Sequence, residues 1–415
     1  MTKLRSLLLG GGAVAAIAAP PSLSAQEVEV RVSAEAGVES NPFLVNDAVD
    51  GDDDDFAAMV GISIEPSIYF TDERSTFRLN SAFRLREYEG SERSNESILV
   101  NAGGTNRIDE RTILNASASF GTSRSAVQDV FRTGSPDLLD PVDGIDPEFP
   151  DFDPTVAGVD RRTYFYGARA SLSRQLSERD AISLGIDANE STIDGSVGND
   201  YRRVGGLVNY ARQLTERTSL QSSLTIAKSD LLNQSFGDGI SLTPLIGVAQ
   251  QVNERLSWAA SGGITYTEIE DGLGGTFKNT DWAATFQLCN RGERSALCAN
   301  AARDARPTTF GGLTTSTSAS LAYNRQLSQV DRVNLAASYR RSERILQTNP
   351  VDDDFLLQDD TFEFFGVNAG YSRNLTDRLL AFSDVGYTDA IGGTTDREGN
   401  FRAVVGLTYV FGGRR

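Results

Sequence analysis

Histidine is missing from all 415 residues of this chain, and its absence removes the commonest general base of enzyme active sites. No Ser-His or Cys-His pair can be assembled, so nucleophilic catalysis of that kind is excluded. A zinc site is improbable too, because the chain has no histidine and only two cysteines to serve as ligands. Paired carboxylates can cleave glycosides, but no spacing of acidic residues marks out such a pair. We therefore predict no enzyme activity, no metal site and no cofactor.

Long apolar runs are absent after the first 25 residues, and none approaches the roughly 18 residues of a membrane-spanning helix. The apolar stretch at residues 7–19 follows Lys3 and Arg5, is broken by Pro20, and leads to small residues before Gln26. This pattern is typical of a secretory signal peptide. We assign residues 1–25 to that peptide and residues 26–415 to the mature domain. The alternative is a retained N-terminal anchor helix.

Cysteine occurs only at Cys289 and Cys298. Export by a signal peptide leads to an oxidising compartment, where thiols pair. We predict a disulfide that closes a small loop, with two free thiols as the alternative.

Lysine and proline are also scarce. Only Lys228 and Lys278 follow the signal peptide, and the formal net charge is −18, which argues against nucleic acid as a partner. Proline contributes 12 residues, whereas Gly, Ser and Thr are abundant. This composition favours many strands joined by short turns.

A six-residue pattern recurs along the chain and is its strongest internal signal. It carries Ser, Thr, Asn or Asp near its centre and ends on an acidic residue followed by arginine. Three copies begin 38 residues apart, at Arg174, Arg212 and Gln250. Four looser copies occupy residues 69–74, 106–111, 325–332 and 373–378. Such residues favour tight turns, so each copy is predicted to join two strands of about a dozen residues, long enough to cross a membrane.

Seven turns join fourteen strands, and residues 27–39 and 399–411 add one strand at each end. We predict an all-β transmembrane antiparallel barrel of about 16 strands, in a bacterial outer membrane, with both termini periplasmic. Because successive strands alternate in direction, only one outer loop fits between the turns near 254 and 331. We place Asp271 to Pro307 in it, together with the disulfide and a short hairpin around Trp282. If that hairpin is a pair of wall strands instead, the count becomes 18.

Alternating polarity assigns the two faces of the predicted strands. In residues 56–70, Ile62, Ile64 and Phe70 fall on one side, whereas Ser63 and Glu65 fall on the other. Residues 77–86 and 401–411 alternate in the same way. We expect the apolar side to face lipid and the polar side to face a lumen. A soluble β-sandwich also alternates, but so many long strands with one polar face favour the water-filled barrel.

The chain ends on a strand, Gly406 to Phe411, that resembles the terminal signal recognised by the outer-membrane barrel-assembly machinery, although Gly412 to Arg415 follow the aromatic residue. With the segment Gly37 to Phe43 and the seven turns, this ending resembles the β-barrel porins found beside exopolysaccharide gene clusters in proteobacteria. The resemblance implies an outer-membrane location and a role in moving or presenting surface polysaccharide. Expected partners are membrane lipid, lipopolysaccharide and the assembly machinery.

The basic residues on the predicted lumenal faces are arginines. Arginine presents a donor fork suited to carboxylates and phosphates, so an arginine-lined pore would favour anions and an acidic polysaccharide as cargo. The alternative is an internal network of ion pairs with lumenal acids such as Asp187, and the common pairing of lumenal charges favours it. The candidate pore-lining residues are Arg31, Glu35, Glu65, Arg78, Arg84, Arg86, Arg169, Arg203, Arg340 and Arg402.

Acidic residues gather in three predicted outer loops, at residues 47–55, 137–153 and 352–360. Oxygen-rich loops can bind Ca²⁺, but none has the EF-hand spacing, so solvated loops are the preferred interpretation. Three functions stay open. They are an exopolysaccharide-associated export channel, a general diffusion porin whose loop 125–160 folds inward as a constriction, and a structural or adhesive barrel that acts through its loops.

Overall fold

The computed structural model describes ten stretches of the chain, and every regular element in them is a β-strand. The stretches are residues 25–44, 56–89, 94–124, 161–194, 200–232, 238–270, 275–308, 312–345, 361–392 and 399–412. The strands are β1 (Ala25–Glu39), β2 (Ala57–Thr71), β3 (Ser75–Tyr88), β4 (Ser94–Asp109), β5 (Thr112–Ser123), β6 (Thr163–Gln175), β7 (Asp180–Ile193), β8 (Tyr201–Thr215), β9 (Thr218–Leu231), β10 (Gly239–Gln251), β11 (Leu256–Glu270), β12 (Thr276–Arg291), β13 (Ser295–Thr308), β14 (Gly312–Gln326), β15 (Asp331–Arg344), β16 (Thr361–Asn374), β17 (Leu379–Gly392) and β18 (Asn400–Gly412). In these stretches no helix is long and apolar enough to cross a membrane.

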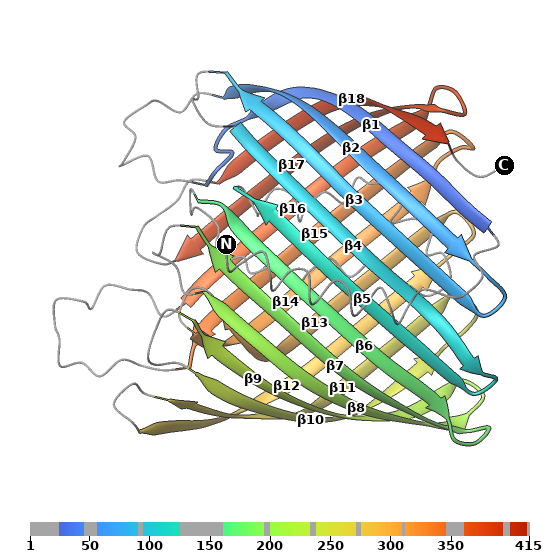
Figure 1. The fold of residues 1–415 in the computed structure, drawn as a ribbon, viewed down its shortest axis with the longest axis vertical. Helices are drawn as coiled ribbons and strands as arrows, with labels where there is room; N and C mark the ends of the chain where they lie inside the picture. The colour runs from blue at the N-terminus through green and yellow to red at the C-terminus, as the bar shows by residue number, and fades with distance from the viewer. Residues whose placement is uncertain are drawn as a thin grey trace.

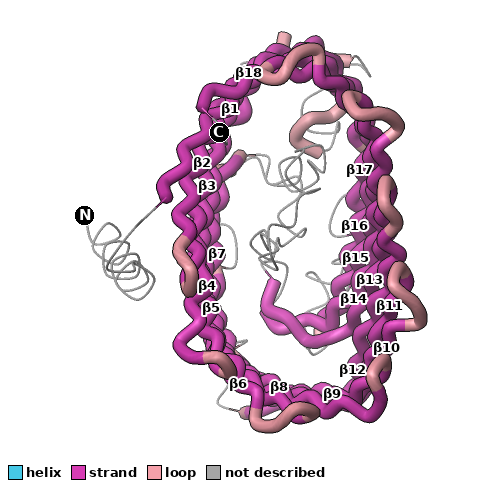
Figure 2. Tube along the Cα trace, turned by 90° about the vertical axis from the view of Figure 1, so that its right-hand side faces the viewer, coloured by secondary structure: helices cyan, strands magenta, loops and turns pink. Residues whose placement is uncertain are grey.

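The strands form one closed antiparallel barrel. Each pairs with its neighbours in sequence, and β1 pairs with both β2 and β18, so the sheet has no free edge strand. Figure 1 shows the tilted strands from the side, and Figure 2 shows the ring that they make. The short turns gather at one end of the barrel, which we call the turn end, and we call the opposite end of the strands the loop end (Figure 1).

The barrel has 18 strands, so the leading prediction of 16 is wrong and the alternative count is confirmed. Asp271 to Pro307 is no outer loop, because most of it forms β12 and β13. A turn at residues 292–294 joins these strands, with Gly292 N donating to Ser295 O at 2.7 Å. Trp282 lies in β12, where its side chain is 59% exposed on the outer face. The eighth turn has Gly292 where the other copies have Ser, Thr, Asn or Asp, which is why the pattern missed it.

The predicted turns are held by their own polar side chains. Ser177 Oγ accepts hydrogen bonds from the backbone N–H groups of Arg179 and Asp180, at 3.2 and 3.1 Å, and donates to Asp180 Oδ2 at 2.6 Å. Tyr210 on the next strand donates to Asp180 Oδ1 at 2.6 Å. Ser328, Asp331 and Tyr371 repeat this arrangement. The recurring motif is therefore a side-chain-capped turn, which explains why it repeats with the strands.

The two faces of the strands follow the predicted alternation. Val60, Ile62 and Ile64 of β2 are 62%, 48% and 43% exposed on the outer face, as are apolar residues of most other strands. Their neighbours Ser63 and Glu65 point the other way, where Ser63 is buried. An outer surface of exposed apolar side chains around a polar interior is the pattern of a barrel in lipid.

The disulfide between Cys289 and Cys298 is present, but it does not close an outer loop. The two residues lie directly opposite each other in the β12–β13 ladder, with their Cα atoms 4.2 Å apart. The bond therefore ties two wall strands together a few residues from their turn. The expected signal peptide lies almost entirely outside the described residues.

Candidate functional site

The interior of the barrel is the candidate site, and one arc of its wall is charged. On β1 and β3, Arg86 Nε donates to Glu35 Oε1 at 2.9 Å, and both side chains are almost fully buried. Gly61 makes room for this pair, because a Cβ there would lie 2.9 Å from Glu35 Oε1. Two more pairs flank it on adjacent strands. They are Arg84–Glu65 at 3.1 Å and Arg402–Asp384 at 2.6 Å.

The other candidate residues also lie on lumenal faces, but they are spread around the ring. Arg31 Nε pairs with Glu29 at 2.6 Å, and Arg203 pairs with Asp187 across β7 and β8. Arg169 on β6 faces the same Asp187 in the ladder, and Arg340 lies farther away on β15. Arg78 donates to Asn80 at 2.8 Å, and its guanidinium lies 4.9 Å from the centre of the Tyr69 ring. That these residues line a conducting pore stays a prediction.

An apolar cluster sits inside the barrel at the loop end of the charged arc. Phe43, Met59, Tyr88 and Val404 are all buried and pack together, with the Phe43 and Tyr88 rings 5.7 Å apart. Phe43 belongs to the segment after β1, which Asn41 anchors by donating its N–H to Asn400 Oδ1 at 3.0 Å. Sequence reasoning missed this cluster. The sequence feature that could have revealed it is the apolar or aromatic character of residues 59, 88 and 404, which fall at lumenal positions of their strands.

The wall splits between β12 and β13. Their ladder ends at Ala284 and Arg303, about half-way along β12. Towards the loop end, β12 stays paired with β11 as far as Thr276, and β13 stays paired with β14 as far as Thr308. The ends of β13 and β14 can therefore leave the wall together.

These ends, residues 304–308 and 312–316, fold into the lumen, and we call them the inward hairpin. Leu313 is 3% exposed, and its Cδ2 lies 3.6 Å from the position that a Cβ on Gly239 of β10 would take. Strands β10 and β14 are four ladder steps apart, about 19 Å along a sheet. The contact therefore requires the hairpin to cross the lumenal side of the wall. In Figure 2 a stretch of strand curves from near β14 into the ring, and β13 also contacts β8 and β11.

Arg303 lies where the hairpin leaves the wall. Its Nη2 is 2.7 Å from Asp281 Oδ2, and its guanidinium lies 4.7 Å from the centre of the Trp282 ring, both on β12. On the other side, its Nη1 donates to Thr317 Oγ1 at 2.8 Å, and Nη2 is 3.8 Å from Glu343. One side chain thus links β12 to β14 and β15 across the split.

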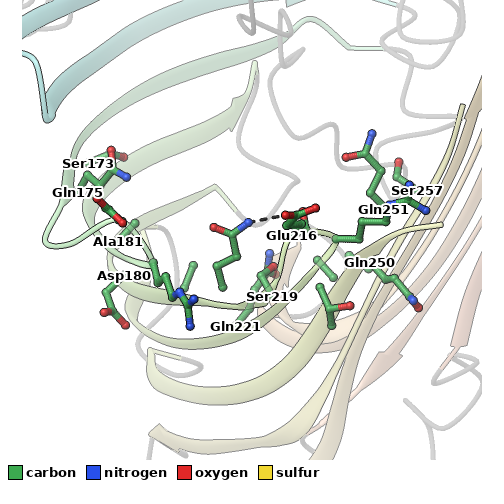
Figure 3. Close-up of a pocket in the computed structure, with 18 of the residues that line it drawn as sticks. Ser173, Gln175, Asp180, Ala181, Glu216, Ser219, Gln221, Gln250, Gln251 and Ser257 are labelled. Carbon is green, nitrogen blue, oxygen red and sulfur yellow. Dashed lines mark hydrogen bonds between the residues drawn. The ribbon is translucent and has the colours of Figure 1, made fainter. Parts of the chain in front are cut away.

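The turn end of the lumen is lined differently. A cavity of about 690 Å³ opens there along β6 to β12. Its wall carries amides and hydroxyls, and Figure 3 shows Ser219, Gln221, Gln251 and Ser257 around it. Charged side chains of both signs also line it, so the surface offers hydrogen bonds and a balanced charge to water and polar solutes. They are Glu110, Glu178, Asp180, Glu216, Arg111, Arg174, Arg179 and Arg217.

Within the described stretches, no group of three or more His, Cys, Asp and Glu side chains could hold a metal ion. The three acidic loops considered for Ca²⁺ binding, and the loop 125–160 predicted as a constriction, all lie outside the described residues. Among the described residues, the β13–β14 hairpin and the segment that carries Phe43 enter the lumen.

Comparison with known proteins gives resemblances of structure alone. No family model and no curated protein matches the chain. Among solved structures, OpdL of Pseudomonas aeruginosa is 13% identical, with 94% of this chain and 99% of that one covered and a TM-score of 0.42. OccK2 (OpdF) of Pseudomonas aeruginosa in complex with glucuronate is 10% identical, covering 94% and 99%, with a TM-score of 0.43. The FrpB iron transporter of Neisseria meningitidis (F3-3 variant) is 9% identical, covering 94% and 82%, with a TM-score of 0.44. We base the proposals that follow on the chain's own residues.

Proposed function

We propose that this chain is an outer-membrane channel through which small hydrophilic solutes diffuse. The observation that carries the proposal is a closed 18-strand ring with an apolar outer face and a polar, charged interior. Barrels of 16 to 18 strands are wide enough to leave an aqueous passage. A membrane-embedded wall also accounts for the many apolar side chains exposed on its outside.

The two ends of the barrel support an orientation. Ala25 pairs beside the first short turn, and Gly412 pairs with Glu29 at the same end of the barrel. Short turns face the periplasm in outer-membrane barrels, so we propose that both termini are periplasmic. Membrane lipid, lipopolysaccharide and the barrel-assembly machinery are the partners that follow from this placement.

The contents of the lumen favour small solutes over a polymer. The inward hairpin and the cluster around Phe43 both occupy space inside the ring. An exopolysaccharide-associated export channel is a second candidate, supported by the resemblance of the first strand, the turns and the last strand. Flux of a labelled acidic polysaccharide through proteoliposomes would separate the two, since a small-solute channel retains the polymer.

Charge selectivity is expected to be weak. Five of the lumenal arginines contact an acidic partner, which favours a network of ion pairs over a free basic surface. Arg78 is partly exposed whereas Arg86 is buried, so we expect the charge of Arg78 to act more strongly on the lumen.

The test is conductance of the refolded mature chain in a planar bilayer, with the reversal potential measured in a KCl gradient. We expect stable openings with a slight preference for anions, and we expect Arg78→Ser to remove that preference while Arg340→Ser serves as a distant arginine control. A folded protein that never opens would rule out the channel.

A further inference from the structure

We propose that the inward hairpin sets the size limit of the channel and that Arg303 is the positioning residue that keeps it in the lumen. This inference rests on the proposed function, because it assigns a size limit to diffusion through the barrel. The solutes admitted would be of monosaccharide or amino-acid size, and oligosaccharides would be excluded.

The first step is the packing of one side of the hairpin on the wall. Leu313 and its ladder partner Pro307 are both buried. Ile269 of β11 is fully buried beside them, with its Cγ1 3.4 Å from the position that a Cβ on Gly239 would take. These apolar groups would face water if the hairpin stood upright, so their burial favours the inward position.

The second step is the side of the hairpin that faces away from the wall. Asp304 and Arg306 alternate with Pro307, and Arg306 Nε donates to both carboxylate oxygens of Asp304, at 2.8 and 2.9 Å. Both side chains are about one-third exposed. The partly exposed part of the hairpin is therefore a charge-balanced ion pair, which suits a boundary that limits size more than charge.

The third step is the anchorage. Arg303 joins Asp281 and Trp282 of β12 to Thr317 of β14 at the residue where the β12–β13 ladder ends. Nearer the turn end, the Cys289–Cys298 disulfide joins β12 and β13 covalently. The split is thus bounded at one end by a disulfide and bridged by the side chain of Arg303.

The first experiment removes the hairpin. Residues 304–316 are replaced by Asn-Gly, a favoured two-residue turn, so that the ladder partners Arg303 and Thr317 are joined directly. Single-channel conductance and liposome swelling in sugars of increasing size are compared with the unaltered protein. We expect conductance to rise by about twofold, as open cross-section increases, and trisaccharides to enter.

The outcomes separate the two proposals. Unchanged conductance and an unchanged sugar cut-off in the shortened protein would overturn the role of the hairpin while leaving the channel intact. Silence of both the unaltered and the shortened protein, each shown to be folded by heat-modifiable migration, would instead reject the channel itself.

A second variant decides the matter if the shortened protein does not fold. Arg303→Ala should raise the sugar cut-off, whereas Arg341→Ala, which removes another arginine near Glu343, should not. A Gly239→Cys and Leu313→Cys crosslink in the Arg303→Ala protein should restore the original cut-off, which a merely structural defect would not allow. An Arg303→Ala cut-off equal to that of the unaltered protein would contradict the inference.

Discussion

Arg86 and Glu35 illustrate what a charge inside this barrel can do. The Arg86 side chain is 2% exposed and that of Glu35 is 6% exposed, so neither meets the bulk solvent of the lumen. Alternation alone predicts both as part of a pore lining. Their burial makes the pair a structural element of the wall instead, because a charge removed from water must be balanced by a partner.

Loss of one partner should therefore be costly. We expect Glu35→Gln to destabilise the barrel by about 3–5 kcal/mol, since Arg86 keeps its buried charge but loses the carboxylate of Glu35. Urea titration of the protein folded into lipid vesicles measures the change in the free energy of unfolding. Glu65→Gln beside the more exposed Arg84 is the matched control and should cost clearly less. Equal effects of the two substitutions would show that burial does not distinguish the pairs.

At the scale of elements, the hairpin turns and the disulfide control how neighbouring strands are joined. The Ser177 hydroxyl makes three hydrogen bonds within its own four-residue turn. The turn at residues 292–294 lacks such a side chain and is instead followed by a covalent cross-strand bond. Each turn is therefore stabilised by local contacts, which are hydrogen bonds in one case and a disulfide in the other.

Removal of the turn cap should have a modest effect. We expect Ser177→Ala to lower the free energy of unfolding by about 1 kcal/mol, the usual net worth of such hydrogen bonds. Glu178→Ala, at the exposed neighbouring position, should change it much less. A Ser177→Ala protein as stable as the control would mean that the turn is set by the strands alone.

Removal of the disulfide should cost more than removal of one cap. The bond spans a sequence separation of 9 residues, and the loop-closure model assigns such a bond about 2–3 kcal/mol. Cys289→Ser with Cys298→Ser should lower the unfolding free energy by that order, measured against the oxidised protein in the same vesicles. Addition of a reductant to the double variant should then have no further effect.

At the scale of the whole molecule, the barrel wall separates lipid from the lumen. Val405, near the middle of β18, is 61% exposed on the outer face, and Val28, near the turn end of β1, is 46% exposed. In a soluble barrel the two positions would be equivalent surface sites. In a membrane they lie at different depths.

This difference gives a test of membrane placement. We expect Val405→Arg to destabilise the folded state by about 2–4 kcal/mol, whereas Val28→Arg near the interface should cost about 0–1 kcal/mol. Folding titrations in vesicles of defined lipid measure both. A small and equal cost at the two positions would favour a barrel that does not span a bilayer.

Local features of the sequence determined much of this structure. The capped turns depend on residues within a few positions of one another, such as Ser177 and Asp180, so their pattern could be recognised directly. Alternation assigns faces because a strand has a period of two, which placed Arg78, Arg84 and Arg86 on one side. The disulfide was predictable from the oxidising compartment that a signal peptide implies. The turn at Gly292 escaped because glycine forms a tight turn without a capping side chain.

Only the tertiary structure decided which strand ends leave the wall and which distant residues meet inside the barrel. Leu313 passes over the lumenal side of the wall to Gly239, and Arg86 of β3 pairs with Glu35 of β1. Both contacts join residues that are distant in the sequence. Alternation states which side a residue takes, but it cannot state whether the strand follows the wall or leaves it. That choice depends on burial of Leu313 and Ile269 against one another, which no local pattern encodes.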